Sequence, residues 1–115
     1  MRMRFKPYAG PELAACPFCV DEPMQNKGRW NEQFARPAQP LMLELGCGKG
    51  KFLAQMAVAH PENNYIGIDI TAKVLILTKR NIDRAYAQAG REVDNVRILT
   101  HDIERIRSMM GEGDR

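Results

Sequence analysis

From residue 41 onward, the hydrophobic positions alternate between two spacings. Three short apolar runs resemble buried strands, and the segments that follow them repeat their apolar residues at helical spacing. The predicted strands cover residues 41–45, 65–70 and 96–99, and the predicted helices cover residues 51–59, about 71–90 and about 103–110. This regular alternation predicts an α/β fold, with a parallel sheet and helices packed on its faces.

The first two predicted helices have recognisable ends and apolar faces. Proline disfavours helical backbone in the residue before it, so His60 ahead of Pro61 ends the first helix. Thr71 is a suitable N-cap for the second helix, and Gly90 is a natural stop at its C-terminus. The residues expected on the apolar faces are Phe52, Leu53, Met56 and Ala57 in the first helix, and Leu75, Thr78, Ile82, Ala85 and Ala89 in the second.

Residues 1–40 show no sustained period and contain most of the prolines, which indicates an extended N-terminal arm. One short helical stretch is expected from about Arg29 to Phe34. Trp30 and Phe34 are four residues apart and would share a face of that stretch. Because buried aromatic side chains mostly contribute packing, we expect the pair to fasten the arm to the rest of the chain. The chain therefore divides into an arm, residues 1–40, and a domain, residues 41–115.

The composition is that of a soluble globular chain, with 44% hydrophobic and 27% charged residues among 115. The net charge of +3 permits an anionic partner but falls short of a strong nucleic-acid footprint. No apolar run approaches the ~18 residues that would suggest a membrane span. The basic start is not followed by the apolar stretch of a signal peptide. We therefore expect a cytoplasmic protein with no membrane segment.

The three cysteines are Cys16, Cys19 and Cys47. An odd number in a chain without an export signal argues against a disulfide framework. Cys16 and Cys19 have the C-x-x-C spacing, but the sequence has no second such pair to complete a zinc site. The favoured interpretation is two ordinary thiols in an N-terminal loop, with a metal or redox role as the alternative.

A glycine-rich loop follows the first predicted strand. Gly46, Gly48 and Gly50 alternate with other residues, and Glu44 precedes the first glycine by two positions. Glycines at this point allow a tight turn and a close approach of ligand to backbone. The spacing differs from the G-x-G-x-x-G of dinucleotide-binding loops, and an acid here would repel a pyrophosphate. The acid suits a cationic ligand such as S-adenosylmethionine, which carries a sulfonium and an ammonium group.

Two further acids follow the next two predicted strands. Asp69 ends the second strand, where a carboxylate can accept hydrogen bonds from ribose hydroxyls. Asp102 follows the third strand and could contact the adenine amino group, or it could simply cap the last helix. Because parallel strands bring their carboxyl ends to one edge, Glu44, Asp69 and Asp102 together predict a cofactor site there.

The segment Leu43–Gly50 resembles the first motif of class I methyltransferases. A narrower resemblance is to the bacterial tRNA (guanine-N7-)-methyltransferase family, and it runs through nearly all of the chain. The cofactor motif is generic to methyltransferases, whereas the other matching segments point to this family. The segments that carry the resemblance are Met1–Pro7, Lys27–Trp30, Glu44–Gly50 and Asn64–Asp69.

The resemblance implies a Rossmann-like fold and transfer of a methyl group from S-adenosylmethionine to N7 of a guanosine in the variable loop of tRNA. The residues it implies for the cofactor are Glu44, Gly46, Gly48, Asp69 and Asp102. Arg2, Arg4 and Lys6 become candidates for contacts with tRNA phosphates, with a solvated terminus as the alternative. The basic residues Lys73, Lys79, Arg80 and Arg84 of the second helix are expected on its solvated outer face.

The sequence departs from the family pattern in one respect. In the family, a carboxylate in an Asp-Pro-Trp motif follows the fourth strand, and this chain has neither that motif nor more than three predicted strands. We therefore expect a parallel sheet truncated after about three strands, with no catalytic residue among the 115. We also expect marginal stability, exposed strand edges and no methyl transfer by this chain alone.

Three other functions stay open on the sequence. The cofactor loop would equally serve a methyltransferase that acts on another substrate. A non-catalytic module that binds tRNA or the cofactor is compatible with the missing motif. An NAD-dependent oxidoreductase is disfavoured by the glycine spacing and by Glu44. The sequence leaves the oligomeric state, monomer or homodimer, undetermined.

Overall fold

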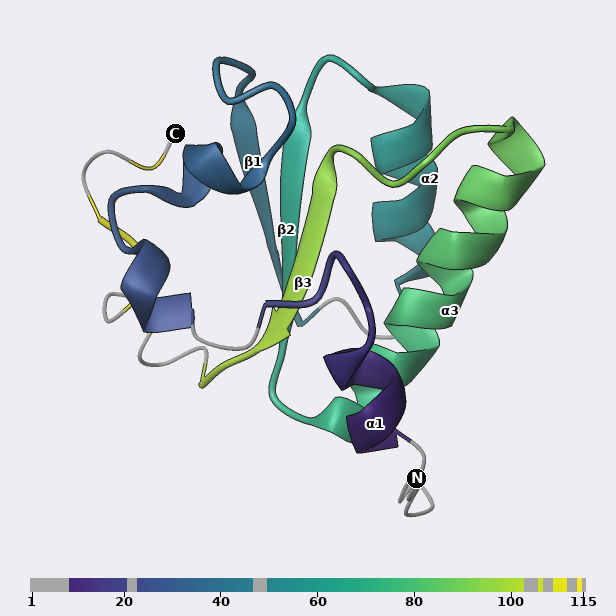
Figure 1. The fold of residues 1–115 in the computed structure, drawn as a ribbon, viewed down its shortest axis with the longest axis horizontal. Helices are drawn as coiled ribbons and strands as arrows, with labels where there is room; N and C mark the ends of the chain where they lie inside the picture. The colour runs from purple at the N-terminus through teal and green to yellow at the C-terminus, as the bar shows by residue number, and fades with distance from the viewer. Residues whose placement is uncertain are drawn as a thin grey trace.

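A computed structural model describes residues 9–20, 23–46, 50–102, 106, 109–111 and 114 (Figure 1). Helices and strands alternate after the arm, as predicted. The elements are α1 Ala9–Ala14, the 3-10 helices η1 Pro23–Asn26 and η2 Trp30–Gln33, β1 Leu41–Leu45, α2 Lys51–Ala59, β2 Asn64–Asp69, α3 Ala72–Ala89 and β3 Val96–Thr100. The helix expected at about residues 103–110 lies largely outside the described residues.

The three strands form one parallel sheet in the order β1-β2-β3. The register places Leu43 beside Ile66 and Ile68 beside Leu99. Figure 1 shows α2 and α3 on one side of the sheet and the segment with η1 and η2 on the other. The predicted α/β class with a parallel sheet is therefore confirmed.

Side chains of β2 alternate between two apolar clusters because successive residues of a strand point to opposite faces. Tyr65 packs with residues of α2 and α3, whereas Ile66 and Ile68 pack with the arm. Trp30 and Phe34 are both buried in the arm-side cluster, together with Leu99 and Met109 of the later chain. The prediction that this aromatic pair fastens the arm is confirmed.

The structure corrects the expectation of a largely extended arm. In addition to η2, which matches the predicted helical stretch, the arm forms α1 and η1. The arm also covers the outer edge of β3, because the N–H of Ile98 donates to the carbonyl of Phe18 and the N–H of Val20 donates to the carbonyl of Ile98, each at 2.9 Å. The edge of β3 was expected to be exposed, and this pairing satisfies it.

Two expectations about burial are wrong. β1 was predicted as a buried strand, yet none of its five residues is buried. In α2, Leu53 and Ala57 are buried as predicted, but Phe52 is 65% exposed. Both departures have the same cause: β1 is the last described strand at its edge of the sheet, and Phe52 lies beside β1 in a groove that no further described strand covers.

The ends of α3 lie where the sequence predicts. Thr71 occupies the N-cap position, although its side chain makes no capping hydrogen bond. Gly90 has the left-handed φ of 70° and its N–H donates to the helix, as expected of a glycine stop. The helix buries Leu75, Ile76, Thr78, Ile82 and Tyr86.

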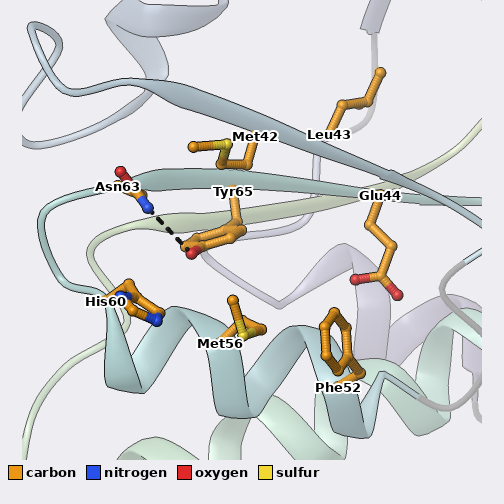
Figure 2. A pocket seen from close by; sticks show the side chains of 8 residues that line it. All are labelled: Met42, Leu43, Glu44, Phe52, Met56, His60, Asn63 and Tyr65. Carbon is orange, nitrogen blue, oxygen red and sulfur yellow. Dashed lines mark hydrogen bonds between the residues drawn. The ribbon is translucent and has the colours of Figure 1, made fainter.

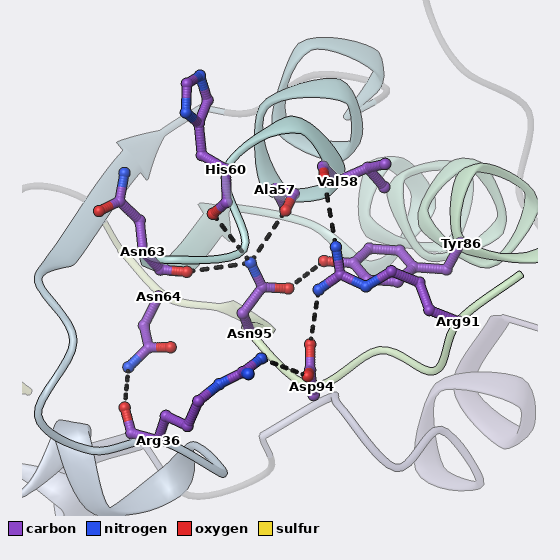
Figure 3. A network of polar contacts seen from close by, with 10 residues as sticks. All are labelled: Arg36, Ala57, Val58, His60, Asn63, Asn64, Tyr86, Arg91, Asp94 and Asn95. Atoms are coloured by element: carbon purple, nitrogen blue, oxygen red, sulfur yellow. Dashed lines mark hydrogen bonds and ion pairs between the residues drawn. The ribbon is translucent and has the colours of Figure 1, made fainter. Parts of the chain in front are cut away.

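A buried amide joins the amino-terminal ends of β2 and β3 to both helices (Figure 3). The Asn95 Nδ2 donates to the carbonyls of Ala57 and Asn63, each at 3.0 Å, and its Oδ1 accepts the hydroxyl of Tyr86. Burial raises the pKa of the Tyr86 phenol to about 12, so the phenol stays a donor at neutral pH. This network fixes the ends of the elements opposite to those that carry the predicted site.

Asp114 ties the end of the chain to the arm. Its carboxylate accepts backbone N–H groups of Gly28, Trp30 and Gly111 at 2.9, 2.8 and 2.6 Å. Hydrogen bonds to a charged acceptor are stronger than neutral ones, so the two contacts with Gly28 and Trp30 stabilise the packing of the arm. No helix among the described residues has the length and apolarity needed to cross a membrane.

Asp114→Asn should lower the free energy of unfolding by about 1–3 kcal/mol, because the amide replaces a charged acceptor and turns a donor toward backbone N–H groups. Chemical denaturation followed by tryptophan fluorescence measures this through Trp30. The exposed Glu92→Gln serves as a matched loss of one carboxylate and should leave stability unchanged. Equal effects from the two substitutions would refute a specific role for Asp114.

Candidate cofactor site at the carboxyl edge of the sheet

The carboxyl ends of the three strands meet at one edge, since all three run parallel. Two backbone hydrogen bonds continue the pairing beyond the strands. The N–H of Gly46 donates to the carbonyl of Ile68 at 2.8 Å, and the N–H of His101 donates to the carbonyl of Asp69 at 3.0 Å. The structure thus brings Gly46, Asp69 and Asp102, two residues past β3, to the same edge.

Asp69 is held firmly at the end of the central strand. It is only 7% exposed, and its Oδ1 accepts the N–H of Ile70 at 2.8 Å. This bond fixes the orientation of the carboxylate at the edge, where it can accept hydrogen bonds from a ligand. Asp102, in contrast, is exposed and takes part in a polar contact of its own.

Glu44 lies on the same face of the sheet as Asp69. In the register of the sheet Glu44 sits beside Gly67, two residues before Asp69, and positions two apart share a face. Gly67 therefore places no side chain beside the Glu44 stem. Gly67 was not among the predicted site residues, although a glycine inside a predicted strand is a signal of close approach.

The Glu44 carboxylate points toward the first turn of α2, at one end of a groove between β1 and that helix (Figure 2). The groove has a volume of about 550 Å³ and is largely apolar. Burial raises the pKa of the Glu44 carboxyl above its usual value. The residues that line the groove are Met42, Leu43, Glu44, Phe52, Met56, His60, Asn63 and Tyr65.

Two glycines of the loop have left-handed backbone. Gly46 has φ +65° and Gly50 has φ +74°. An added Cβ on Gly50 would meet the Thr78 Cγ2 at 2.5 Å, so this glycine lets the start of α2 approach α3 closely. The predicted site residue Gly48 lies between them but outside the described residues, as do Arg2, Arg4 and Lys6.

Gly50→Ala should destabilise the chain by roughly 2 kcal/mol or more, because a left-handed backbone and an overpacked contact each cost about 1 kcal/mol or more. Gly90→Ala is a matched control, since Gly90 has φ +70° but open space where its Cβ would lie. Thermal or urea unfolding compares the two. The prediction fails if both substitutions cost the same.

Part of the predicted outer face of α3 is in fact an internal contact with α1. Lys79 pairs with Asp83 at 2.7 Å and with Glu12 at 3.5 Å, and Arg80 also binds the Glu12 carboxylate, at 2.7 Å. The Lys79 side chain is only 19% exposed. These two cations therefore hold the arm helix against α3, which a helical pattern alone could not indicate.

The described edge presents acidic side chains and turn backbone to a ligand. Acceptors of this kind bind the hydroxyl, amino and ammonium groups of a nucleoside that carries an amino-acid chain. Among the residues that the structure describes, no three His, Cys, Asp or Glu side chains are grouped so that they could hold a metal ion. The acceptors at the edge fit a polar organic cation.

Comparison with known proteins agrees with this chemistry. Residues 38–114 match the family described as "Putative methyltransferase". The whole chain is 47% identical to a tRNA (guanine-N(7)-)-methyltransferase of Clostridium perfringens strain SM101, and covers 52% of that protein. Proteins of the same name from Ruminiclostridium cellulolyticum and Clostridium beijerinckii are each 48% identical over 99% of the chain. The chain spans about half the length of these relatives.

Proposed function

The chain belongs to the methyltransferase family that matches residues 38–114, and we propose that it is the S-adenosylmethionine-binding, N-terminal portion of a tRNA (guanine-N7-)-methyltransferase. The observation that carries the proposal is the edge at which Gly46, Asp69 and Asp102 converge, with Glu44 on the face that Asp69 shares. In this proposal, residues 1–40 form an arm and residues 41–115 form half of the cofactor domain.

The residues of the edge fit the parts of S-adenosylmethionine. The oriented Asp69 carboxylate would accept hydrogen bonds from the ribose hydroxyls. The left-handed turn at Gly46 would let the ligand approach the backbone. Asp102 would accept a hydrogen bond from the adenine amino group. Glu44 would face the ammonium of the amino-acid end, directly or through water. Gly48 belongs to the same loop. When bound, the sulfonium of the cofactor supplies an activated methyl group.

The proposed acceptor is N7 of a variable-loop guanosine, because the relatives carry that activity in their names. Guanine N7 already has a lone pair, so the reaction requires no general base. The task of the protein is to hold N7 in line with the methyl group at close approach. Arg2, Arg4 and Lys6 are candidates for binding tRNA phosphates. We expect a cytoplasmic location, because the proposed enzyme modifies tRNA.

We expect methyl transfer to require more polypeptide than these 115 residues. Met42, Leu43, Leu45 and Phe52 of the β1 edge and groove are 40–65% exposed, which is unusual for so many neighbouring large apolar side chains. A protein of the relatives' length has roughly as much chain again with which to cover them. The exposed edge thus supports the expectation that the chain alone does not methylate tRNA.

The proposal is tested by joining residues 1–115 to the remaining half of the Clostridium perfringens relative. Incubation with tRNA and S-adenosylmethionine labelled in its methyl group should yield N7-methylguanosine in the variable loop, detected by mass spectrometry of nuclease fragments. Asp69→Ala in the same chimera should abolish the product. Methylation of another nucleotide would point to a different substrate, and a folded chimera without any transfer would count against the proposal.

The raised pKa of Glu44 predicts how affinity for S-adenosylmethionine depends on pH. Protonation neutralises the carboxylate, so affinity for the cationic ligand should fall as the pH drops through this raised pKa, at a higher pH than for an ordinary glutamate. Calorimetric titrations at several pH values measure the effect, with Glu44→Gln as control. The variant should bind more weakly and lose this part of the pH dependence; identical profiles would exclude Glu44 from the site.

A further inference from the structure

Cys16 and Cys19 occupy the two ends of a tight turn between α1 and the edge of β3. The N–H of Cys19 donates to the carbonyl of Cys16 at 3.4 Å, which closes a four-residue turn through Pro17 and Phe18. The first and fourth Cα atoms of such a turn lie less than about 7 Å apart. Disulfides join Cα atoms about 4.4–6.8 Å apart, so the backbone already has a suitable span.

The surrounding structure holds this turn in place. The N–H of Cys16 donates to the carbonyl of Leu13 at 3.1 Å, and Phe18 is buried in the core and paired with Ile98 of β3. Cys19 itself forms a parallel bridge with Ile98. The two thiols are free, and their side chains interact closely enough to shift each other's pKa. A bond between them therefore requires rotation of side chains and little movement of the backbone.

The charges around the pair favour a thiolate at Cys16. The hydrogen bond from the Cys19 thiol lowers the pKa of Cys16, and the N–H of Phe18 and the charge of Lys79 act in the same direction, against the effect of burial. Arg97 supplies a second positive charge that interacts with Cys16. The pKa of Cys19 is raised, first by the side-chain hydrogen bond to Cys16 and then by burial. Cys16 is thus favoured as the attacking thiolate, and Cys19 stays a protonated thiol that can react with Cys16 in a second step.

We propose that Cys16 and Cys19 are a modification site at which hydrogen peroxide forms a reversible disulfide between arm residues beside β3. Cys16 is only 6% exposed and Cys19 is half-buried, so a small oxidant such as hydrogen peroxide should reach the pair more readily than a bulky one. The site lies on the outer edge of β3 and uses none of the residues assigned to the cofactor. It therefore stands or falls independently of the proposed methyltransferase function.

The reaction proceeds in two displacements. The Cys16 thiolate attacks one oxygen of hydrogen peroxide; an S–O bond forms, the O–O bond breaks, and hydroxide leaves and takes up the thiol proton as water. Cys19 then loses its proton and attacks the Cys16 sulfur; the S–S bond forms, the S–O bond breaks, and the departing hydroxide becomes a second water. In sum, two thiols are oxidised and one peroxide is reduced to two waters.

The test uses the reduced 115-residue chain, treated with hydrogen peroxide, alkylated with iodoacetamide and digested for mass spectrometry. The peptide that contains residues 16–19 should lose two hydrogens and carry no alkyl group, and dithiothreitol before alkylation should restore two alkylated cysteines. Cys47→Ser should retain the bridge in full, whereas Cys16→Ser and Cys19→Ser should each lose it completely. A treated peptide with two alkyl groups, or with sulfinic acid in place of the bridge, would overturn the proposal.

The rate of bridge formation tests the electrostatic part of the mechanism. Lys79→Gln removes one of the two cations that interact with Cys16 and should slow the reaction by about threefold to tenfold, since one unit of thiol pKa is a tenfold change in the ratio of thiolate to thiol. Arg84→Gln is the matched control, because Arg84 lies on the same helix and contacts Asn81. Equal rates in the two variants would overturn the role assigned to Lys79.

Discussion

Replacing Trp30 with alanine is expected to lower the free energy of unfolding by about 4 kcal/mol or more, because truncating a buried aromatic side chain costs about 3–5 kcal/mol and a lost buried hydrogen bond adds to this. Trp30 is fully buried between the arm and the sheet. Its Nε1 donates to the carbonyl of Met109 at 2.5 Å. The substitution therefore leaves a cavity and an unsatisfied carbonyl in the same place.

Urea denaturation followed by circular dichroism measures this effect. Trp30→Phe separates the two contributions, since it keeps much of the ring volume and removes the N–H donor, and it should cost less than Trp30→Ala. Phe52→Ala is the control for removal of an aromatic ring, because Phe52 is 65% exposed and should cost little. If Trp30→Ala were no more harmful than Phe52→Ala, the arm would not be packed as the structure describes.

The second large effect concerns the cofactor. Asp69→Ala should weaken binding of S-adenosylmethionine by at least about 100-fold, because two hydrogen bonds to a charged acceptor contribute ~1.5–3 kcal/mol each. The carboxylate is buried at the strand end and already oriented by the N–H of Ile70. No rearrangement is then needed when the ligand arrives, so the full strength of both bonds is available.

Isothermal titration of the variant checks this prediction, with circular dichroism to show that it remains folded. Asp69→Asn keeps the size of the side chain and one acceptor oxygen, and it should bind more tightly than Asp69→Ala but more weakly than the original chain. Glu92→Ala removes an exposed carboxylate far along the chain from the site and should not change affinity. Undiminished binding by Asp69→Ala would remove Asp69 from the site.

The elements that the sequence predicts well are those with a sustained period. The helices at residues 51–59 and 72–89 and the three strands agree with the structure to within two residues, because their apolar residues form short runs or recur at helical spacing. The helix α1 was missed because six residues with a glycine and a proline show no period. The exposure of β1 was missed because it depends on which segments lie beside the strand.

The candidate site shows the same division between local and long-range information. Gly46, Asp69 and Asp102 could be placed at one edge from the sequence, because parallel strands must align their carboxyl ends. The contact of Gly50 with Thr78 could not, since it joins two helices. The carboxylate of Asp114 was likewise unpredictable, because its partners at Gly28 and Trp30 are more than 80 residues away along the chain. The roles of the site residues themselves stay predictions.

We propose that this chain has a site for S-adenosylmethionine at the carboxyl edge of its sheet. The most direct test is isothermal titration of S-adenosylmethionine into the purified 115-residue chain, after circular dichroism has established that the chain is folded. Saturable binding at one site, lost in Asp69→Ala, is the result that the arrangement of Glu44, Asp69 and Asp102 predicts. A folded chain that takes up no S-adenosylmethionine would contradict the claim.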